Sequence, residues 1–89
     1  MLKIMTSADA EQRIRATLGQ IGVHFGKDGR EGTLIRMRLT HQDIAHYASV
    51  SRETVTRLLD KLKKSGEIDI PGRWSILLKP GFFEKNRFL

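Results

Sequence analysis

The sequence THQDIAHYASVSRETVTRLLDKLKKSG, which runs from Thr40 to Gly66, predicts two short helices with a tight break between them. Thr40 followed by Asp43 is similar to a capping box, in which a hydroxyl and a carboxylate three residues later satisfy free N–H groups at the start of a helix. Ser51 supplies a second N-cap hydroxyl further along the same stretch. Two helix starts this close together predict a helix-turn-helix over residues 40–66.

The second of these helices has one apolar side and one charged side. Its aliphatic residues recur at i, i+3, i+4 and i+7, which places them on one face of a helix that must cover a core. These residues are Val55, Leu58, Leu59 and Leu62. At about 100° per residue the opposite face is polar. It holds Glu53, Arg57, Asp60 and Lys64, with Thr56 on its shoulder and Arg52 at its leading edge. Gly66 is expected to end the helix, because glycine adopts the left-handed conformation without steric cost.

Length and composition limit the classes of function. With 89 residues the chain is expected to form one domain, residues 1–89, with a modest core. A net charge of +6 and a sequence pI of about 10.2 favour a polyanionic partner or an anionic membrane surface. Because no apolar run is long enough to span a bilayer and no signal peptide is evident, we expect a cytoplasmic protein without a membrane partner.

The sequence offers no constellation of residues for catalysis. It contains no cysteine, which excludes disulfides and cysteine-ligated metals, and no nucleophile–base pair or carboxylate dyad stands out. His41 and His46 are five residues apart, which does not place them on one helical face, so no metal site is expected. We therefore expect a binding protein, not an enzyme, with neither a catalytic residue nor a cofactor-binding residue.

The chain before the helix-turn-helix predicts a helix, a turn and a strand. Apolar residues at helical spacing predict an amphipathic scaffold helix from about residue 7 to residue 25. The glycine-rich segment 26–33 is typical of a hairpin turn or a mobile loop. Partial alternation over residues 34–39 predicts a short strand, whose Arg36 and Arg38 would face solvent or nucleic-acid phosphate.

The chain after Gly66 predicts a two-stranded hairpin over residues 67–79, the wing of a winged helix. Ile68 and Ile70 alternate with acidic residues, and Pro71-Gly72 is a turn dipeptide. Residues 74–78 then predict the returning strand.

Beyond these strands, aromatic residues are expected to complete the core. Trp74 could stack on a base, but a lone tryptophan on a wing strand more often lies in the core. Pro80-Gly81 should break the strand, after which Phe82-Phe83 and Phe88-Leu89 suggest a terminal segment that packs one or two aromatic rings on the core.

The helix-turn-helix residues also carry a resemblance to a known family. The sequence LTHQDIA over residues 39–45, followed by SRETVTR over residues 51–57, resembles the C-terminal DNA-binding domain of the Crp/Fnr family of bacterial transcription regulators. The resemblance extends more weakly to residues 13–14 and to residues 71–73, and so covers most of the chain. It implies that the second helix enters the major groove of double-stranded DNA and that the wing contacts the DNA backbone.

Three side chains of the second helix are suited to reading base edges. The planar guanidinium groups of Arg52 and Arg57 match the O6 and N7 acceptors of guanine, and Glu53 can accept from the amino group of cytosine. A carboxylate gains nothing from a polyanion as such, which favours directional reading, although Glu53 could instead favour the helix N-terminus or pair with Arg57. The resemblance implies the same three roles and a TGTGA-like half-site.

Other polar residues are suited to holding DNA phosphates. They combine short hydroxyl or amide donors with cationic side chains near the two helix starts, the second helix and the wing tip. These residues are Thr40, Gln42, Ser51, Thr54, Thr56, Lys61, Lys64 and Arg73. For any one hydroxyl, helix capping and solvation explain its presence equally well.

The resemblance also implies parts of a regulator that would precede this segment. An effector would bind a sensor domain there, so no cofactor is expected in this chain, and residues 1–6 would be a remnant of the dimerisation helix. A homodimer is expected only with that helix, and RNA polymerase would be a partner of the full-length regulator. Two positions depart from the family: Ser49 replaces the usual turn glycine, and Asp60 replaces a basic or neutral residue and could pair with Lys64.

Together these patterns predict an α+β, mainly α fold: a winged helix-turn-helix with a three-helix core and a small β-hairpin wing. The leading hypothesis for function is sequence-specific binding of double-stranded DNA. The alternative is a winged-helix module for protein–protein interaction without specific DNA binding.

Overall fold

The computed structural model describes residues 7–85. Its elements in chain order are α1 (Ser7–Phe25), β1 (Lys27–Gly29), β2 (Gly32–Arg36), α2 (His41–Ala48), α3 (Arg52–Lys64), β3 (Ile68–Asp69), β4 (Ser75–Leu78) and α4 (Pro80–Lys85). The predictions for residues 1–6 and for Phe88-Leu89 lie outside the described residues. The predicted scaffold helix, the helix-turn-helix and the wing strands are all confirmed as elements.

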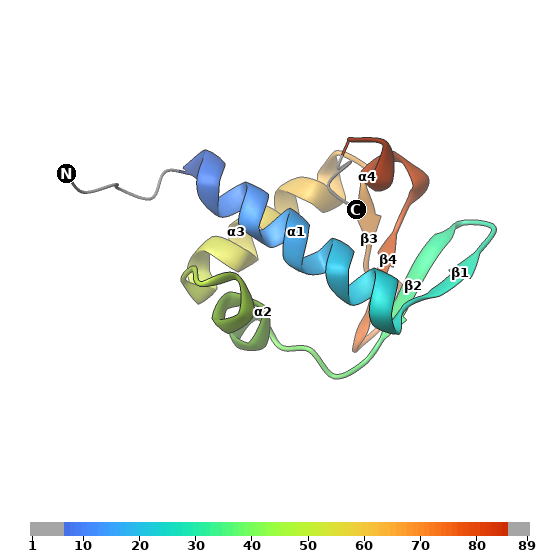
Figure 1. Ribbon diagram of the computed structural model, residues 1–89, viewed down its shortest axis with the longest axis horizontal. Coiled ribbons are helices and arrows are strands. Elements are labelled where there is room, and N and C mark those ends of the chain that lie inside the picture. The colour runs from blue at the N-terminus through green and yellow to red at the C-terminus, as the bar shows by residue number, and fades with distance from the viewer. Residues whose placement is uncertain (1–6, 86–89) are drawn as a thin grey trace.

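Helix α1 is the centre of the fold, as Figure 1 shows. It packs against α2 and α3 along its length and against β2 near its C-terminal end. The sheet stands at that end, α2 lies below α1 in this view, and α3 crosses behind α1 towards β3 (Figure 1). This arrangement leaves one side of α3 without any covering element.

The wing belongs to a larger sheet than the sequence predicted. All strands are antiparallel and follow the order β1-β2-β4-β3, so the segment predicted as a turn or loop, residues 26–33, forms a hairpin with β2. Strand β4 pairs with β3 on one edge and with β2 on the other, where Ile35 faces Ile76. The predicted strand 34–39 is too long: β2 ends at Arg36, since the backbone turns where Leu39 N–H donates to the Met37 carbonyl at 2.8 Å.

The aliphatic stripe of α3 lies in the core as predicted. Val55 and Leu62 are completely buried, and Leu58 and Leu59 nearly so. They meet Ile14 and Leu18 of α1 and buried residues of α2 and the sheet in a single cluster. Burying these side chains removes apolar surface from water and holds the charged face of α3 outward.

Helix ends follow the predicted caps. Thr40 Oγ1 accepts from Asp43 N–H at 2.9 Å, and the Asp43 carboxylate accepts from Thr40 N–H at 3.0 Å, which completes the capping box. Ser51 Oγ accepts from Thr54 N–H at 3.1 Å. At the other end of α3, Gly66 has φ of 83°, and Glu67 N–H donates to the Leu62 carbonyl at 3.1 Å. The glycine therefore ends α3 as expected.

Ser49 adopts the left-handed conformation that the family's turn glycine would adopt, with φ of 59° and ψ of 49°. The turn is closed by a hydrogen bond from Val50 N–H to the Ala45 carbonyl at 3.0 Å. The left-handed conformation strains Ser49, because Ser49 has a Cβ. Replacing Ser49 with Gly is expected to raise stability by about 0.5 to 1 kcal/mol, and the melting temperature by roughly 2 to 8 °C.

Thermal unfolding followed by circular dichroism measures this effect. Ser65→Gly is the matched control, since Ser65 has φ of −79° and its hydroxyl donates to the Leu62 carbonyl. The control should lower the melting temperature. A lower melting temperature for Ser49→Gly would show that the left-handed serine carries no strain.

Pro80 does end β4, but it also begins α4, because the fixed φ of proline suits the first position of a helix. Phe82 of α4 is completely buried, and its ring meets that of Phe83 edge to face, with ring centroids 5.3 Å apart. The predicted return of an aromatic ring to the core is confirmed for Phe82, while Phe83 is half-buried.

Candidate nucleic-acid interface

The outer face of α3 presents the three predicted base readers together. Arg52, Glu53 and Arg57 are all exposed: Glu53 and Arg57 lie opposite the aliphatic stripe, and Arg52 lies at the leading edge of the helix, as its first residue. Arg52 Nη2 lies 3.6 Å from Glu53 Oε2, and these side chains are 57% and 77% exposed. Such an exposed pair contributes little to stability and leaves both groups available to a ligand. The face thus combines two guanidinium forks and one carboxylate within its first two turns.

Several hydroxyls that were predicted to hold phosphates also bond within the protein. Ser51 Oγ and Thr54 Oγ1 are 2.8 Å apart at the start of α3. Thr56 Oγ1 donates to the Arg52 carbonyl at 3.2 Å and lies 2.7 Å from His41 Nδ1. Because a hydroxyl has a single proton, Thr56 then accepts from His41 Nδ1–H. These bonds fasten α2 to the outer side of α3 and orient the hydroxyls next to the base readers.

The two predicted lysine contacts differ in their surroundings. Lys64 Nζ pairs with Asp60 Oδ2 at 3.0 Å, as expected for the acidic residue that departs from the family. Lys61 Nζ instead reaches back to α1 and pairs with Glu11 Oε1 at 2.8 Å. Lys61 therefore links α3 to α1, a contact that the sequence pattern did not indicate.

Lys61 is part of an ion-pair network that holds α1 against the end of α3. Arg15 pairs with Glu11 at 2.9 Å, and it reaches the buried carboxylate of Glu67 with contacts of 2.5 and 3.2 Å. Ser65 Oγ lies 2.9 Å from the same carboxylate and 2.9 Å from the Leu62 carbonyl, so its single proton is shared between these two acceptors. The pKa of Glu11 is lowered, and the main cause is the hydrogen bond from Lys61. The pKa of Arg15 is raised, and the main cause is its hydrogen bond to Glu67. The network links α1 to the last turns of α3 and to the residue that follows Gly66.

Glu11 makes the stability of the domain depend on pH. The pKa of Glu11 in the folded chain is below the ordinary value of 4.5. The ionised carboxylate therefore stabilises the folded domain fully above about pH 4.5, and this stabilisation is lost as the pH falls through the pKa of the folded chain. Glu11→Gln should therefore cost about 0.2 to 1 kcal/mol at neutral pH and progressively less below pH 4.5.

Urea unfolding of both proteins from pH 7 to pH 3 measures this difference. The capping residue Asp43 also has a lowered pKa, chiefly through the backbone N–H of Thr40, and it destabilises both proteins alike in acid. A difference between wild type and Glu11→Gln that stayed constant with pH would contradict the assignment.

The wing tip departs from prediction at Trp74. Arg73 is exposed at the tip, as expected, but Trp74 does not lie in the core: it is 39% exposed and precedes β4. Its φ of 60° is a left-handed conformation that costs about 1 to 2 kcal/mol for a residue with a Cβ. The Arg38 guanidinium lies 5.2 Å from the centre of the indole ring. No periodic signal links Arg38 to Trp74, so the sequence could not pair them.

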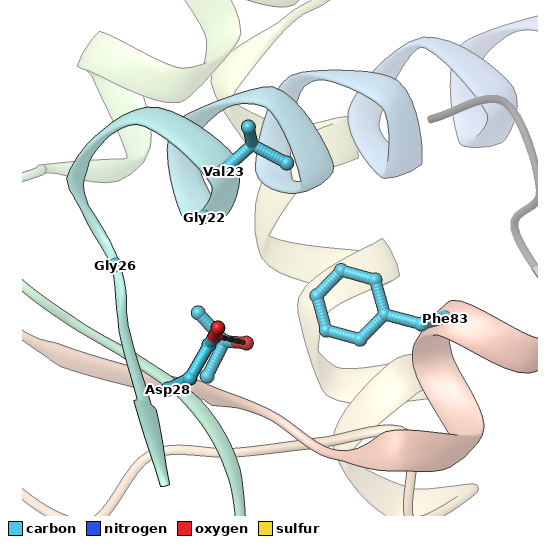
Figure 2. Close-up of a pocket in the computed structure, with 6 residues that line it drawn as sticks. Gly22, Val23, Gly26, Asp28 and Phe83 are labelled. Carbon is cyan, nitrogen blue, oxygen red and sulfur yellow. Dashed lines mark hydrogen bonds between the residues drawn. The ribbon is translucent and has the colours of Figure 1, made fainter.

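A cavity lies away from the outer face of α3. A cavity of about 410 Å³ is formed by the end of α1, the β1–β2 hairpin and α4, with Gly22, Asp28 and Phe83 in its wall (Figure 2). The Asp28 carboxylate there accepts from Thr33 Oγ1 at 2.8 Å. Within residues 7–85 no group of three or more His, Cys, Asp or Glu side chains could hold a metal ion. No helix in this range combines the length and apolar character needed to cross a membrane.

The fold agrees with that of known regulators. Residues 12–81 match the Crp-like helix-turn-helix domain. Electron transport regulator A of Shewanella oneidensis is 31% identical over 78 residues, which are 88% of this chain and 31% of that protein. The fumarate and nitrate reduction regulatory protein of Escherichia coli is 28% identical over 74 residues, which are 83% of this chain and 30% of that protein.

Solved structures agree as well. The CO-dependent transcription factor CooA of Carboxydothermus hydrogenoformans has a TM-score of 0.77 at 27% identity, over 89% of this chain and 37% of that chain. The Catabolite Activator Protein of Thermus thermophilus has a TM-score of 0.68 at 25% identity, over 92% of this chain and 35% of that chain. The chain spans about a third of the length of the regulators it matches. It belongs to the Crp/Fnr family of DNA-binding transcription regulators, as a Crp-like helix-turn-helix domain.

Proposed function

We propose that this domain binds double-stranded DNA with sequence specificity, with α3 in the major groove and the wing tip on the backbone. The half-site is TGTGA-like. Arg52 and Arg57 each donate two hydrogen bonds to a guanine, and Glu53 accepts from a cytosine amino group on the opposite strand. The protein binds and positions DNA; the proposal assigns it no catalytic step.

One observation carries the proposal: Arg52, Glu53 and Arg57 stand together on the uncovered side of a helix whose other side is buried. A helix with side chains is narrow enough to enter the major groove of B-DNA, which is about 12 Å wide. The net charge of +6 attracts the duplex without reading it, whereas a carboxylate among the cations can accept a hydrogen bond from a base amino group.

The phosphate contacts surround this face. Thr40, Gln42, Ser51 and Thr54 lie at the starts of α2 and α3, where free backbone N–H groups add to the side-chain donors. Thr56, Lys61, Lys64 and Arg73 complete the proposed set; Lys61 would have to exchange its bond to Glu11 for a phosphate.

A full-length regulator of this kind would present two such domains as a homodimer. By two-fold symmetry they would read an inverted repeat, with half-site centres about 34 to 36 Å apart along the DNA. An effector site, a dimerisation helix and contact with RNA polymerase belong to that larger assembly. The isolated domain is expected to bind a single half-site weakly as a monomer.

Fluorescence anisotropy with labelled duplexes tests the proposal. One duplex contains a single TGTGA half-site, and a second of equal length and composition has its bases shuffled. The domain should prefer the first by at least about tenfold at 50 mM salt, since each mismatched base pair in a specific site typically costs about 1 to 3 kcal/mol. Equal affinity for both duplexes would contradict base reading by α3.

A salt series separates DNA binding from the protein-interaction alternative. Contacts to several phosphates should make affinity fall steeply and log-linearly between 50 and 200 mM salt. A module that recognises protein through apolar surface would show no affinity for either duplex beyond a weak, sequence-independent association.

A further inference from the structure

The turn at the wing tip contains a residue that its backbone does not favour. Ser75 N–H donates to the Gly72 carbonyl at 3.2 Å, so Arg73 and Trp74 are the two central residues of this turn. Trp74 occupies the second central position with φ of 60°, where turns of this kind usually contain Gly or Asn. Its side chain is 39% exposed and is not part of the buried core cluster. A residue held in a left-handed conformation outside the core suggests a role at the surface.

The partner of Trp74 is on a different segment of the chain. Arg38 belongs to the linker between β2 and α2, and its guanidinium stacks over the indole ring at 5.2 Å. Trp74 also lines a cleft of about 270 Å³. Arg73 and Trp74 line it from the wing, and Thr40 and His41 line it from the start of α2. The Arg38–Trp74 pair therefore joins the wing tip to the start of the helix-turn-helix.

The wing tip has few other restraints. Strand β3 has only two residues, and both pair with the far end of β4, so the segment from Ile70 to Trp74 lies beyond the ladder. A tip held only by its turn would lose conformational freedom when Arg73 engaged a phosphate, and that loss weakens binding. A cation–π contact that orders the tip beforehand removes part of this cost.

We propose that Arg38 and Trp74 are positioning residues, which hold the wing tip in place so that Arg73 meets the DNA backbone beside the start of α2. Trp74 has no charge and acts only through the placement of its neighbour. The inference rests on the proposed DNA binding, and it assigns to this pair a function in affinity and none in base reading.

A double-mutant cycle between Trp74→Gly and Arg73→Ala tests the proposal. Trp74→Gly removes the contact with Arg38 and the covered part of the indole, while glycine suits the left-handed turn position, so thermal unfolding is used to establish that the variant is folded at the binding temperature. It should weaken binding to the TGTGA duplex by about 3- to 10-fold, the cost of ordering one or two side chains. In the Arg73→Ala background the same change should weaken binding by less than about twofold.

Arg38→Met with Arg36→Met as its control separates positioning from charge. Both arginines are exposed and lie two residues apart, but Arg38 is the one stacked on Trp74. Loss of charge alone would weaken binding equally in both variants. We expect a larger loss for Arg38→Met, and easier acrylamide quenching of Trp74, which is the only tryptophan in the chain.

The outcomes distinguish this inference from the proposed function. If wild type prefers the TGTGA duplex but Trp74→Gly binds equally well, or loses the same factor with and without Arg73, the positioning role is wrong and DNA reading stands. If wild type binds neither duplex, both proposals are wrong.

Discussion

Replacing Arg57 with Ala is expected to weaken binding to a TGTGA-containing duplex by about 1 to 3 kcal/mol, or roughly 5- to 150-fold. The side chain is exposed on the outer face of α3 and carries no packing role, so the fold should be unaffected. Because a bidentate contact reads a single guanine, the variant should also lose its preference at one base pair only. Anisotropy with duplexes that differ at each position of the half-site measures both effects.

Lys63→Ala is the matched control for Arg57→Ala. Lys63 is also exposed on α3, and its ammonium group can contact a phosphate but has no planar fork for a guanine. The control should weaken binding to all duplexes alike and reduce the slope of log affinity against log salt by up to about one. Uniform losses in both variants would show that Arg57 holds the backbone and does not read a base.

Replacing Phe82 with Ala is expected to destabilise the domain by about 3 to 5 kcal/mol. The Phe82 ring is completely buried in the core cluster, and its loss would leave a cavity beneath α4. The free energy of unfolding of a domain is typically about 5 to 15 kcal/mol, so this substitution would remove a large part of it. Phe82 lies just beyond the family match, which ends at residue 81. Urea unfolding therefore tests whether α4 belongs to the folded unit.

Phe83→Ala provides the control in the same helix. Phe83 is half-buried and lines the cavity of Figure 2, so its removal exposes less apolar surface and should cost about 1 kcal/mol. Equal, small losses for both variants would mean that α4 is only loosely attached to the core.

The sequence by itself determined the elements and the outward face of α3. Thr40 with Asp43, Ser51 and Gly66 are local signals, since each cap involves groups only a few residues apart. The helical period of the aliphatic stripe is equally local, and it places Glu53 and Arg57 opposite the core, with Arg52 at the leading edge of the helix, without any knowledge of what the core contains. For this reason the helix-turn-helix, its boundaries and the exposure of its proposed base readers could be predicted correctly.

Only the tertiary structure decided which distant segments meet. The pairing of β2 with β4 makes the wing part of a four-stranded sheet, and the bond between Lys61 and Glu11 turns a predicted phosphate contact toward α1. Trp74 lies outside the core cluster, with the Arg38 guanidinium over its ring. Each contact joins residues far apart in the chain, and its geometry depends on how whole elements pack. The sequence shows the charge and type of each side chain. Which distant side chain it contacts depends on how the elements pack around the core.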